Sequence, residues 1–183
     1  MKALLIVHIQ RDIVNEDAPF GKMFAPEIAR RGVLEAITDT ADTMRELGGL
    51  VVWLRIAFSG DYQANMPLLQ AAQEAGCLRE GTPGAELVLA QALGDIVVTH
   101  TRPGPFTDSE LEEVLRDRGV TDVYVAGVAT NASVEACVRQ AADLGFYAHV
   151  VEPACASSNA LAHEASISTM QTLFCCSVVR NVN

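Results

Sequence analysis

Residues 123–134 decide the fold that this sequence is expected to adopt, because an apolar run leads directly into a turn that contains a glycine. The run reads Val123-Tyr124-Val125-Ala126, and the turn reads Gly127-Val128-Ala129-Thr130-Asn131-Ala132-Ser133. The run is typical of a buried strand, and Thr130 or Asn131 can cap a helix that begins at the turn. Ser133 then falls in the first helical turn, whose free N–H groups can hold an oxyanion.

The same succession of apolar run and helical pattern continues on both sides of this stretch. Apolar runs without polar alternation predict strands covered on both faces, and helices between them predict a parallel sheet with right-handed crossovers. We therefore expect an α/β fold, a three-layer sandwich with about six mainly parallel strands, as one domain over residues 1–183. The expected strands are Ala3–Val7, Leu50–Ile56, Ile96–His100, Val123–Ala126, Tyr147–Val151 and, more weakly, Phe174–Val179. The expected helices are Pro26–Leu47, Asp108–Arg118, Asn131–Leu144 and Asn159–Leu173.

The stretch Phe58–Pro83 interrupts this succession with several glycines and prolines around a short helical pattern near Leu68–Glu74. An insertion of this length between strands is often a lid or a subunit contact. It can equally be a surface excursion without a role.

Composition limits the partners and the compartment that we expect. Half of the 183 residues are apolar and the net charge is −10, which argues against nucleic acid or an anionic membrane as the main partner. No apolar run reaches the roughly 18 residues of a membrane span, and the apolar N-terminal run is too short for a signal peptide. The five cysteines lack metal-type spacing, and their odd number predicts free thiols in a reducing cytoplasm.

Three polar residues mark one edge of the expected sheet. In parallel sheets covered by helices, ligands bind at the carboxyl ends of the strands. His8 follows the first strand, His100 ends the third, and Ser133 lies in the turn after the fourth. The sequence therefore places two imidazoles and a hydroxyl where a small-molecule site is expected.

Four stretches have an order and spacing that occur together in one family. They are Leu4–Asp12, Gly81–Leu87, Val97–Leu111 and Gly127–Val134, and they span nearly the whole chain. In these stretches the sequence resembles the isochorismatase-like cysteine hydrolases, which include nicotinamidases and N-carbamoyl amidohydrolases. The resemblance implies the fold and a homo-oligomer, commonly a dimer or a tetramer.

The resemblance also locates the family's catalytic residues. Its acid–base Asp, its Lys and its nucleophilic Cys correspond to His8, His100 and Ser133, so all three differ here. The amidase chemistry of the family is therefore implied less strongly than its fold. The nicotinamidase metal site, an Asp with nearby histidines after the second strand, has no match in Arg55–Asp61, and we expect no metal and no cofactor.

The three replacements are chemically coherent with one another. A cysteine thiol, with a pKa of about 8.5, is readily activated, whereas a serine hydroxyl needs a base such as a neutral imidazole. We therefore predict that Ser133 is the nucleophile and His8 its base, while His100 polarises the substrate, either as a protonated partner or as a hydrogen-bond donor. The backbone N–H groups of Ala129 and Ser133 would form the oxyanion hole, as the turn of the family does. Two adjacent imidazoles would also lower each other's pKa.

Several other residues have weaker predicted roles. Asp12 can orient His8, but we favour a structural role in closing the turn after the first strand. Cys137, one turn after Ser133, is a possible displaced nucleophile, although a buried cysteine is usually plain packing.

His8, His100 and Asp12 could also ligate a metal, and His149 and His163 are expected to be structural. The predicted substrate contacts are Asp12, Arg55, Phe58, Phe106 and Val128.

Two functional hypotheses remain open at this point. The first is a metal-independent hydrolase of a small amide, ester or related bond, with its substrate unknown. The second is a catalytically inactive domain that binds a small molecule or a partner protein. The coherence of the replacements favours the first slightly.

Overall fold

The structure, a computed structural model, describes residues 1–59, 70, 72, 74–173 and 176–183. Its centre is one sheet with the strand order β3-β2-β1-β4-β5-β6, in which every neighbouring pair is parallel. The predicted parallel six-stranded sheet is therefore confirmed. The strands are β1 (Lys2–Val7), β2 (Leu50–Ile56), β3 (Ile96–His100), β4 (Asp122–Val128), β5 (Tyr147–Ala156) and β6 (Ser177–Val179).

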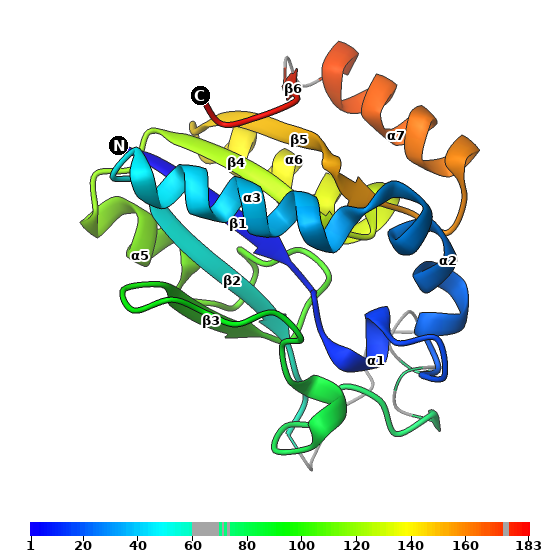
Figure 1. Ribbon diagram of the computed structural model, residues 1–183. Helices are drawn as coiled ribbons and strands as arrows, with labels where there is room; N and C mark the ends of the chain where they lie inside the picture. Colours follow the sequence, from blue (N-terminus) through cyan, green and yellow to red (C-terminus); the bar gives the residue numbers. More distant parts are fainter. Residues whose placement is uncertain (60–69, 71, 73, 174–175) are drawn as a thin grey trace.

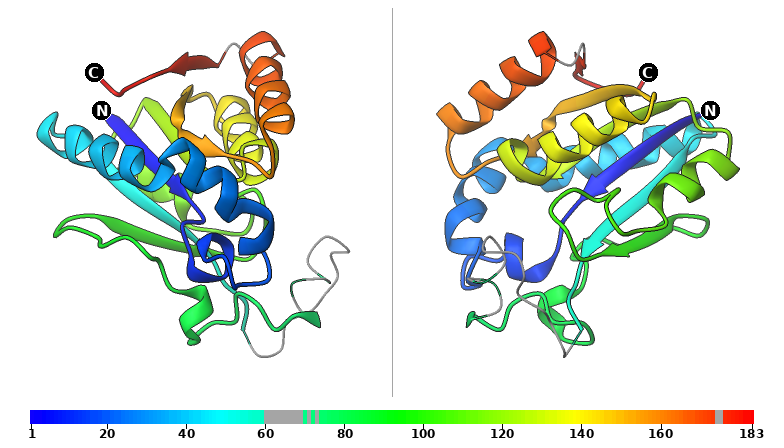
Figure 2. Two further views of the ribbon diagram at one scale, coloured as in Figure 1. Left: turned by 45° about the vertical axis from the view of Figure 1, so that its right-hand side comes forward. Right: turned by 180° about the vertical axis from the view of Figure 1, so that it is seen from behind.

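Helices cover both faces of the sheet, so that β1 lies in the middle layer (Figures 1 and 2). On one face of the sheet, apolar side chains of α2 and α3 pack against the strands and form one cluster. On the other face, α5 and α6 contribute side chains to a second cluster. Helix α7 packs beside α6. The helices are α1 (Arg11–Val14), α2 (Gly21–Arg31), α3 (Val33–Glu46), α5 (Leu111–Asp117), α6 (Glu135–Asp143) and α7 (Ala160–Leu173), with a 3-10 turn at Pro83–Ala85 (η1) and a π-helical turn at Thr130–Val134 (η2).

The predicted helix Pro26–Leu47 is wrong in one respect, because the structure divides it into α2 and α3. The chain turns at Gly32, whose φ of 64° is left-handed and whose N–H caps the end of α2. Pro26 lies inside α2 rather than at its start, so the helix begins earlier than the sequence suggested. The apolar spacing continues through both helices, which explains why the break was missed.

Other boundaries shift by a few residues. The last predicted helix is confirmed as α7, with Asn159 accepting the amide of Ala162. The helix expected from Asp108 begins only at Leu111, since Asp108 has a left-handed φ of 53°. Strand β5 continues to Ala156 through an irregular register with β4. Most of the predicted pattern at Leu68–Glu74, and the first two residues of the predicted strand Phe174–Val179, lie outside the described residues.

Gly127 permits the close approach of β4 to the end of β1. Its φ is 119°, and a Cβ at this position would overlap the backbone oxygen and nitrogen of Val7. Val7 precedes His8, and Gly127 precedes the turn that carries Ser133. A glycine is thus required where the two predicted site segments leave neighbouring strands.

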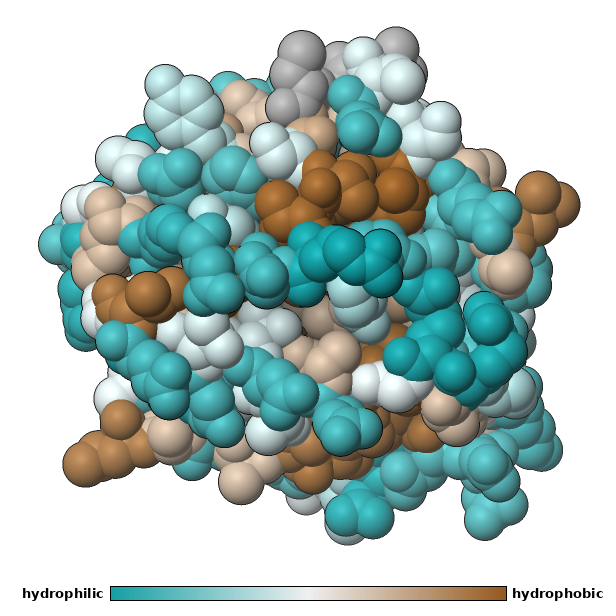
Figure 3. Space-filling model, turned by 45° about the horizontal axis from the view of Figure 1, so that its top comes forward, coloured by the Kyte–Doolittle hydropathy of each residue, from teal (hydrophilic) through white to brown (hydrophobic). Residues whose placement is uncertain are grey.

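On the face shown in Figure 3, hydrophilic side chains predominate and hydrophobic side chains gather in separate patches. Within the described part of the chain, no helix is long and apolar enough to cross a membrane.

We predict that Gly127→Ala lowers the free energy of unfolding by at least about 2 kcal/mol, because the methyl group meets the backbone of Val7. Gly94→Ala is the matched control, since Gly94 also has a positive φ of 99° but faces open space. Urea unfolding measures both variants. Equal losses in the two variants would show that the approach of β4 to β1 does not need the glycine.

Candidate functional site

His8 leaves β1 with a backbone conformation that is unusual for histidine. Its φ is 54°, in the left-handed region, which costs a residue with a Cβ about 1 kcal/mol or more. Its amide donates to the carbonyl of Leu54 at 3.0 Å, which continues the pairing of β1 with β2 for one more residue. The side chain is 4% exposed. The regular alternation of β1 thus ends at His8, and the surrounding structure fixes its direction.

His8 meets His100, the last residue of β3. Their Nε2 atoms are 3.2 Å apart, and the rings are inclined by 27° with centroids separated by 5.0 Å. His100 is 1% exposed. The sequence placed both residues at the carboxyl edge of the sheet, and the structure brings them into direct hydrogen-bond contact although β2 lies between their strands.

The hydrogen bonds of His100 fix which nitrogen atoms of the pair carry protons. Nδ1 of His100 lies 2.8 Å from the carbonyl oxygen of Arg102, which can only accept, so Nδ1 carries the proton. In a neutral His100, Nε2 then holds a lone pair and accepts the Nε2–H of His8. A neutral His8 is left with a lone pair on Nδ1. This nitrogen has no partner among the described residues and is not sealed from solvent, unlike the buried Nδ1 of His149.

Both imidazoles are neutral near pH 7. Burial, followed by the charge of His100, holds the pKa of His8 well below its usual value. Burial also lowers the pKa of His100 to about 4, although the hydrogen bond to Arg102 opposes this shift. The pair is therefore an uncharged base, and the position where related sequences are expected to carry Lys offers no cation.

Ser133 lies in η2, after the carboxyl end of β4. The amides of Ala132 and Val134 both donate to the carbonyl of Ala129. Ala129 occupies the N-cap position, so the prediction that Thr130 or Asn131 caps this helix is wrong. Instead, the hydroxyl of Thr130 contacts His163, and the side chain of Asn131 accepts a hydrogen bond from Ser157.

The hydroxyl of Ser133 is accessible to solvent but is not hydrogen-bonded to either imidazole. Ser133 is 7% exposed, and among the described residues its hydroxyl makes no hydrogen bond. Because this unbonded hydroxyl is not among the polar atoms that are fully shielded from solvent, it keeps contact with solvent. The structure thus joins the two histidines but leaves the predicted Ser133–His8 hydrogen bond unformed.

Two predicted substrate contacts are held elsewhere. Asp12 accepts the amide of Leu78 at 2.7 Å, so its role is structural, but it holds a distant segment of the chain and does not close the turn after β1 as predicted. Arg55 follows Trp53 on the face of β2 that packs toward α3, whereas His100 follows Val98 on the opposite face. The guanidinium of Arg55 contacts Thr99 and Glu86. Neither charged group is brought to the histidine pair.

The predicted apolar contacts lie in the packed layers. Phe58 and Val128 belong to the cluster under α3, and Phe106 packs against the other cluster, with its ring 6.1 Å from that of Phe146. Cys137 is fully buried in that second cluster, and burial raises the pKa of its thiol strongly. A displaced nucleophile at Cys137 is therefore contradicted. Among the described residues, no three His, Cys, Asp or Glu side chains converge as a metal site.

Gln10 is a residue whose role the sequence analysis missed. It is fully buried, and its amide group donates to the carbonyls of Ile56 and Ala85 and accepts the amide of Ile56. The side chain thus replaces a missing strand neighbour where β1 and β2 end. A glutamine among apolar residues immediately after a strand was the available signal.

Comparison with known proteins agrees with this architecture. The isochorismatase domain, as a sequence family, matches residues 2–180. The chain belongs to the isochorismatase family. The uncharacterized isochorismatase family protein YecD of Escherichia coli O157:H7 is 31% identical over 170 residues, which cover 91% of this chain and 85% of YecD.

One further relative has a named activity, and another has a solved structure. The ureidoacrylate amidohydrolase RutB of Klebsiella pneumoniae is 26% identical over 190 residues, covering 94% of this chain and 80% of RutB. A crystal structure of an isochorismatase family protein from Desulfovibrio vulgaris superposes with a TM-score of 0.86 at 26% identity, covering 97% of this chain and 93% of that protein. The predicted family and fold are confirmed, and one of these relatives is an amidohydrolase.

We predict that the histidine pair makes stability depend on pH between about 6.5 and 4. Because the folded pKa values are depressed, unfolding takes up protons as the pH falls below the unfolded value, and stability is lost in that direction. Each histidine contributes a slope of up to about 1.4 kcal/mol per pH unit.

Urea unfolding at a series of pH values, compared with the double variant His8→Asn and His100→Asn, measures this contribution. The wild-type free energy of unfolding should fall more steeply with acid than that of the variant. If the free energy of unfolding depended on pH equally in the wild type and the variant, the two imidazoles would titrate in the folded protein as they do in the unfolded chain.

Proposed function

We propose that this member of the isochorismatase family hydrolyses a small amide, ester or related bond without a metal ion, using His8 as base and Ser133 as nucleophile. The observation that carries the proposal is the buried, neutral His8–His100 pair, whose bond to the carbonyl of Arg102 leaves a lone pair on His8 Nδ1. Membership of a family that includes amidohydrolases supports the reaction class.

The first half of the reaction transfers one proton. The Ser133 oxygen attacks the substrate carbonyl carbon, and its proton passes to Nδ1 of His8. The resulting His8 cation keeps its Nε2–H bond to the lone pair of His100, whose own Nδ1–H remains on Arg102. In this mechanism His100 is not the polariser expected from the sequence, but the acceptor that orients the base, a role that a carboxylate fills in serine hydrolases.

The second half returns that proton. The N–H groups of Ala129 and Ser133 hold the tetrahedral oxyanion, as predicted from the turn. When the intermediate collapses, the carbon–nitrogen or carbon–oxygen bond of the substrate breaks and His8 protonates the leaving group. A water molecule then gives a proton to His8 and attacks the acyl carbon of the Ser133 ester. The bond from that carbon to the Ser133 oxygen breaks, and His8 returns its proton to this oxygen. The Ser133 hydroxyl has to approach Nδ1 when substrate binds, a closure common in catalytic hydrogen bonds.

A second function, binding without catalysis, is favoured by one observation. The Ser133 hydroxyl makes no hydrogen bond to either imidazole in the described structure. In such a domain the histidine pair and the hydroxyl would contact a small polar ligand, and no covalent intermediate would form.

We predict that a fluorophosphonate adds its mass to Ser133, and that Ser133→Ala abolishes both this adduct and turnover of activated esters. Ser168→Ala is the control, since Ser168 is an exposed serine on α7. His8→Asn should lower the rate by about 10²- to 10⁴-fold, because asparagine tolerates a left-handed φ but is no base. Peptide mass spectrometry and ester hydrolysis give the two readouts.

The same experiment separates the two functions. No adduct on Ser133, with equal ester turnover in the wild type and in Ser133→Ala, would contradict the hydrolase mechanism and leave binding alone. In that case, ligands that raise the melting temperature of the wild type but not of His8→Asn would identify the binding site.

A further inference from the structure

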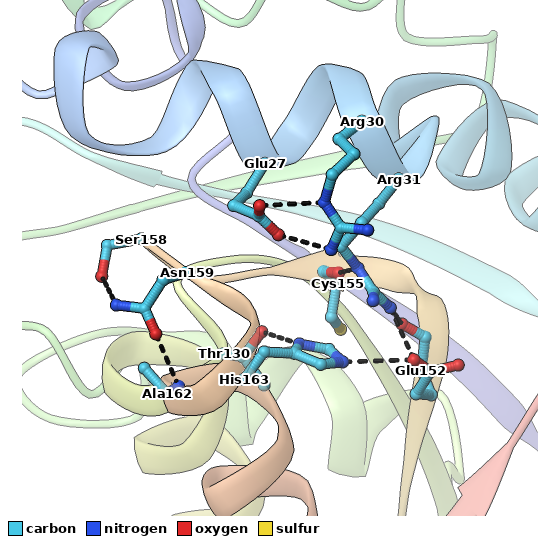
Figure 4. A network of polar contacts seen from close by, with 10 residues as sticks. All are labelled: Glu27, Arg30, Arg31, Thr130, Glu152, Cys155, Ser158, Asn159, Ala162 and His163. Atoms are coloured by element: carbon cyan, nitrogen blue, oxygen red, sulfur yellow. Dashed lines mark hydrogen bonds and ion pairs between the residues drawn. The ribbon is translucent and has the colours of Figure 1, made fainter.

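A chain of polar side chains runs behind the turn that carries Ser133, on the side of β5 and α7. The hydroxyl of Thr130 lies 2.8 Å from Nδ1 of His163, and Nε2 of His163 lies 3.2 Å from Glu152. Arg31, the last residue of α2, binds the same carboxylate oxygen of Glu152 at 2.5 Å. Figure 4 shows this continuous line from Arg31 through Glu152 and His163 to Thr130.

The chain is buried where it meets the turn. Thr130 is 0% and His163 is 2% exposed. Arg31 also donates to the backbone carbonyls of Glu152 and Cys155, so it fixes the irregular part of β5 from which Glu152 projects. Because Thr130 is fully buried, loss of its hydroxyl would leave Nδ1 of His163 without its hydrogen-bond donor.

The direction of each hydrogen bond follows from the charges. Burial alone would raise the pKa of Glu152, but hydrogen bonds from Arg31 and His163 lower it, so its carboxylate is ionised and only accepts. His163 therefore carries its proton on Nε2. Burial, the largest influence, lowers the pKa of His163 although the hydrogen bond to Glu152 opposes this shift. The imidazole is therefore neutral near pH 7, and its Nδ1 accepts the hydroxyl proton of Thr130.

Helix α7 holds Thr130 at a second point. Ser166, one helical turn after His163, has its hydroxyl 3.1 Å from the carbonyl of Thr130 and 2.6 Å from the carboxylate of Glu135. Both the side chain and the backbone of Thr130 therefore contact α7. Thr130 is the first residue of η2, and Glu135 follows its last residue. The turn is anchored at both ends, with Ser133 between the anchors.

We propose that Arg31, Glu152 and His163 form a positioning relay that, through Thr130, fixes the orientation of the backbone amides around Ser133. The relay residues are positioning residues, because they contact the turn rather than a substrate. Their catalytic consequence rests on the proposed hydrolase function. Since the amides of the turn stabilise an oxyanion that exists only in the transition state, a loosened turn should lower kcat and leave KM nearly unchanged.

The test compares Thr130→Val with Thr130→Ser and with Thr40→Val. Valine keeps the shape of Thr130 but leaves Nδ1 of His163 without a donor, whereas serine restores the hydroxyl. Thr40 is the matched control, since it is a buried threonine in α3 whose hydroxyl also has one partner, the carbonyl of Ala36. Hydrogen exchange of peptides covering residues 128–134 and steady-state ester hydrolysis are measured on the full chain.

In Thr130→Val, exchange of these amides should accelerate about tenfold or more and kcat should fall about tenfold with KM within about twofold. Thr130→Ser should recover both values, and Thr40→Val should change neither. Exchange and kcat in Thr130→Val equal to those of Thr40→Val would overturn the relay, even if Ser133 is reactive.

The two proposals fail separately. If the wild type shows no ester turnover but amide exchange is faster in Thr130→Val than in the other proteins, the hydrolase proposal is refuted and the relay proposal is supported. Should Thr130→Val not fold, Glu152→Gln tests the relay from its other end, because it removes the charge that fixes the proton of His163 on Nε2. Faster exchange at residues 128–134 supports the relay there, and unchanged exchange contradicts it.

Discussion

The hydrogen bond from Nδ1 of His100 to the carbonyl of Arg102 determines the chemistry of the proposed site. A carbonyl can only accept, so it places the proton of His100 on Nδ1 and the lone pair on Nε2. That lone pair accepts from His8, and His8 presents its own lone pair at the edge of the sheet. A backbone atom thus sets the protonation of two side chains, one of which belongs to a distant strand.

Under the proposed mechanism, this arrangement would replace the catalytic residues that the resemblance to the isochorismatase family leads one to expect. The family pattern pairs an acid–base Asp with a Lys, two opposite charges, where this chain has two neutral imidazoles. The sum of charges is the same before reaction. In the proposed mechanism the difference arises on proton transfer, because His8 would become a buried cation that is hydrogen-bonded to the neutral acceptor His100. A serine nucleophile suits this base better than it suits a carboxylate.

Much of the fold could be predicted from the sequence, because buried parallel strands are continuous apolar runs and end in recognisable turns. The positions of His8, His100 and Ser133 at one edge followed from that pattern. The break at Gly32 did not, since the apolar spacing continues through it. The left-handed φ of His8 and the relay through Arg31 and Glu152 depend on contacts between residues far apart in the chain, which no local pattern records.

Nitrogen-15 NMR of the imidazole rings measures these protonation states, with His8→Asn and His100→Asn serving to assign the signals. At pH 7 we expect two neutral rings of opposite tautomer, with the proton on Nε2 in His8 and on Nδ1 in His100. A proton on Nδ1 of His8, or a doubly protonated ring in either residue at that pH, would contradict this expectation.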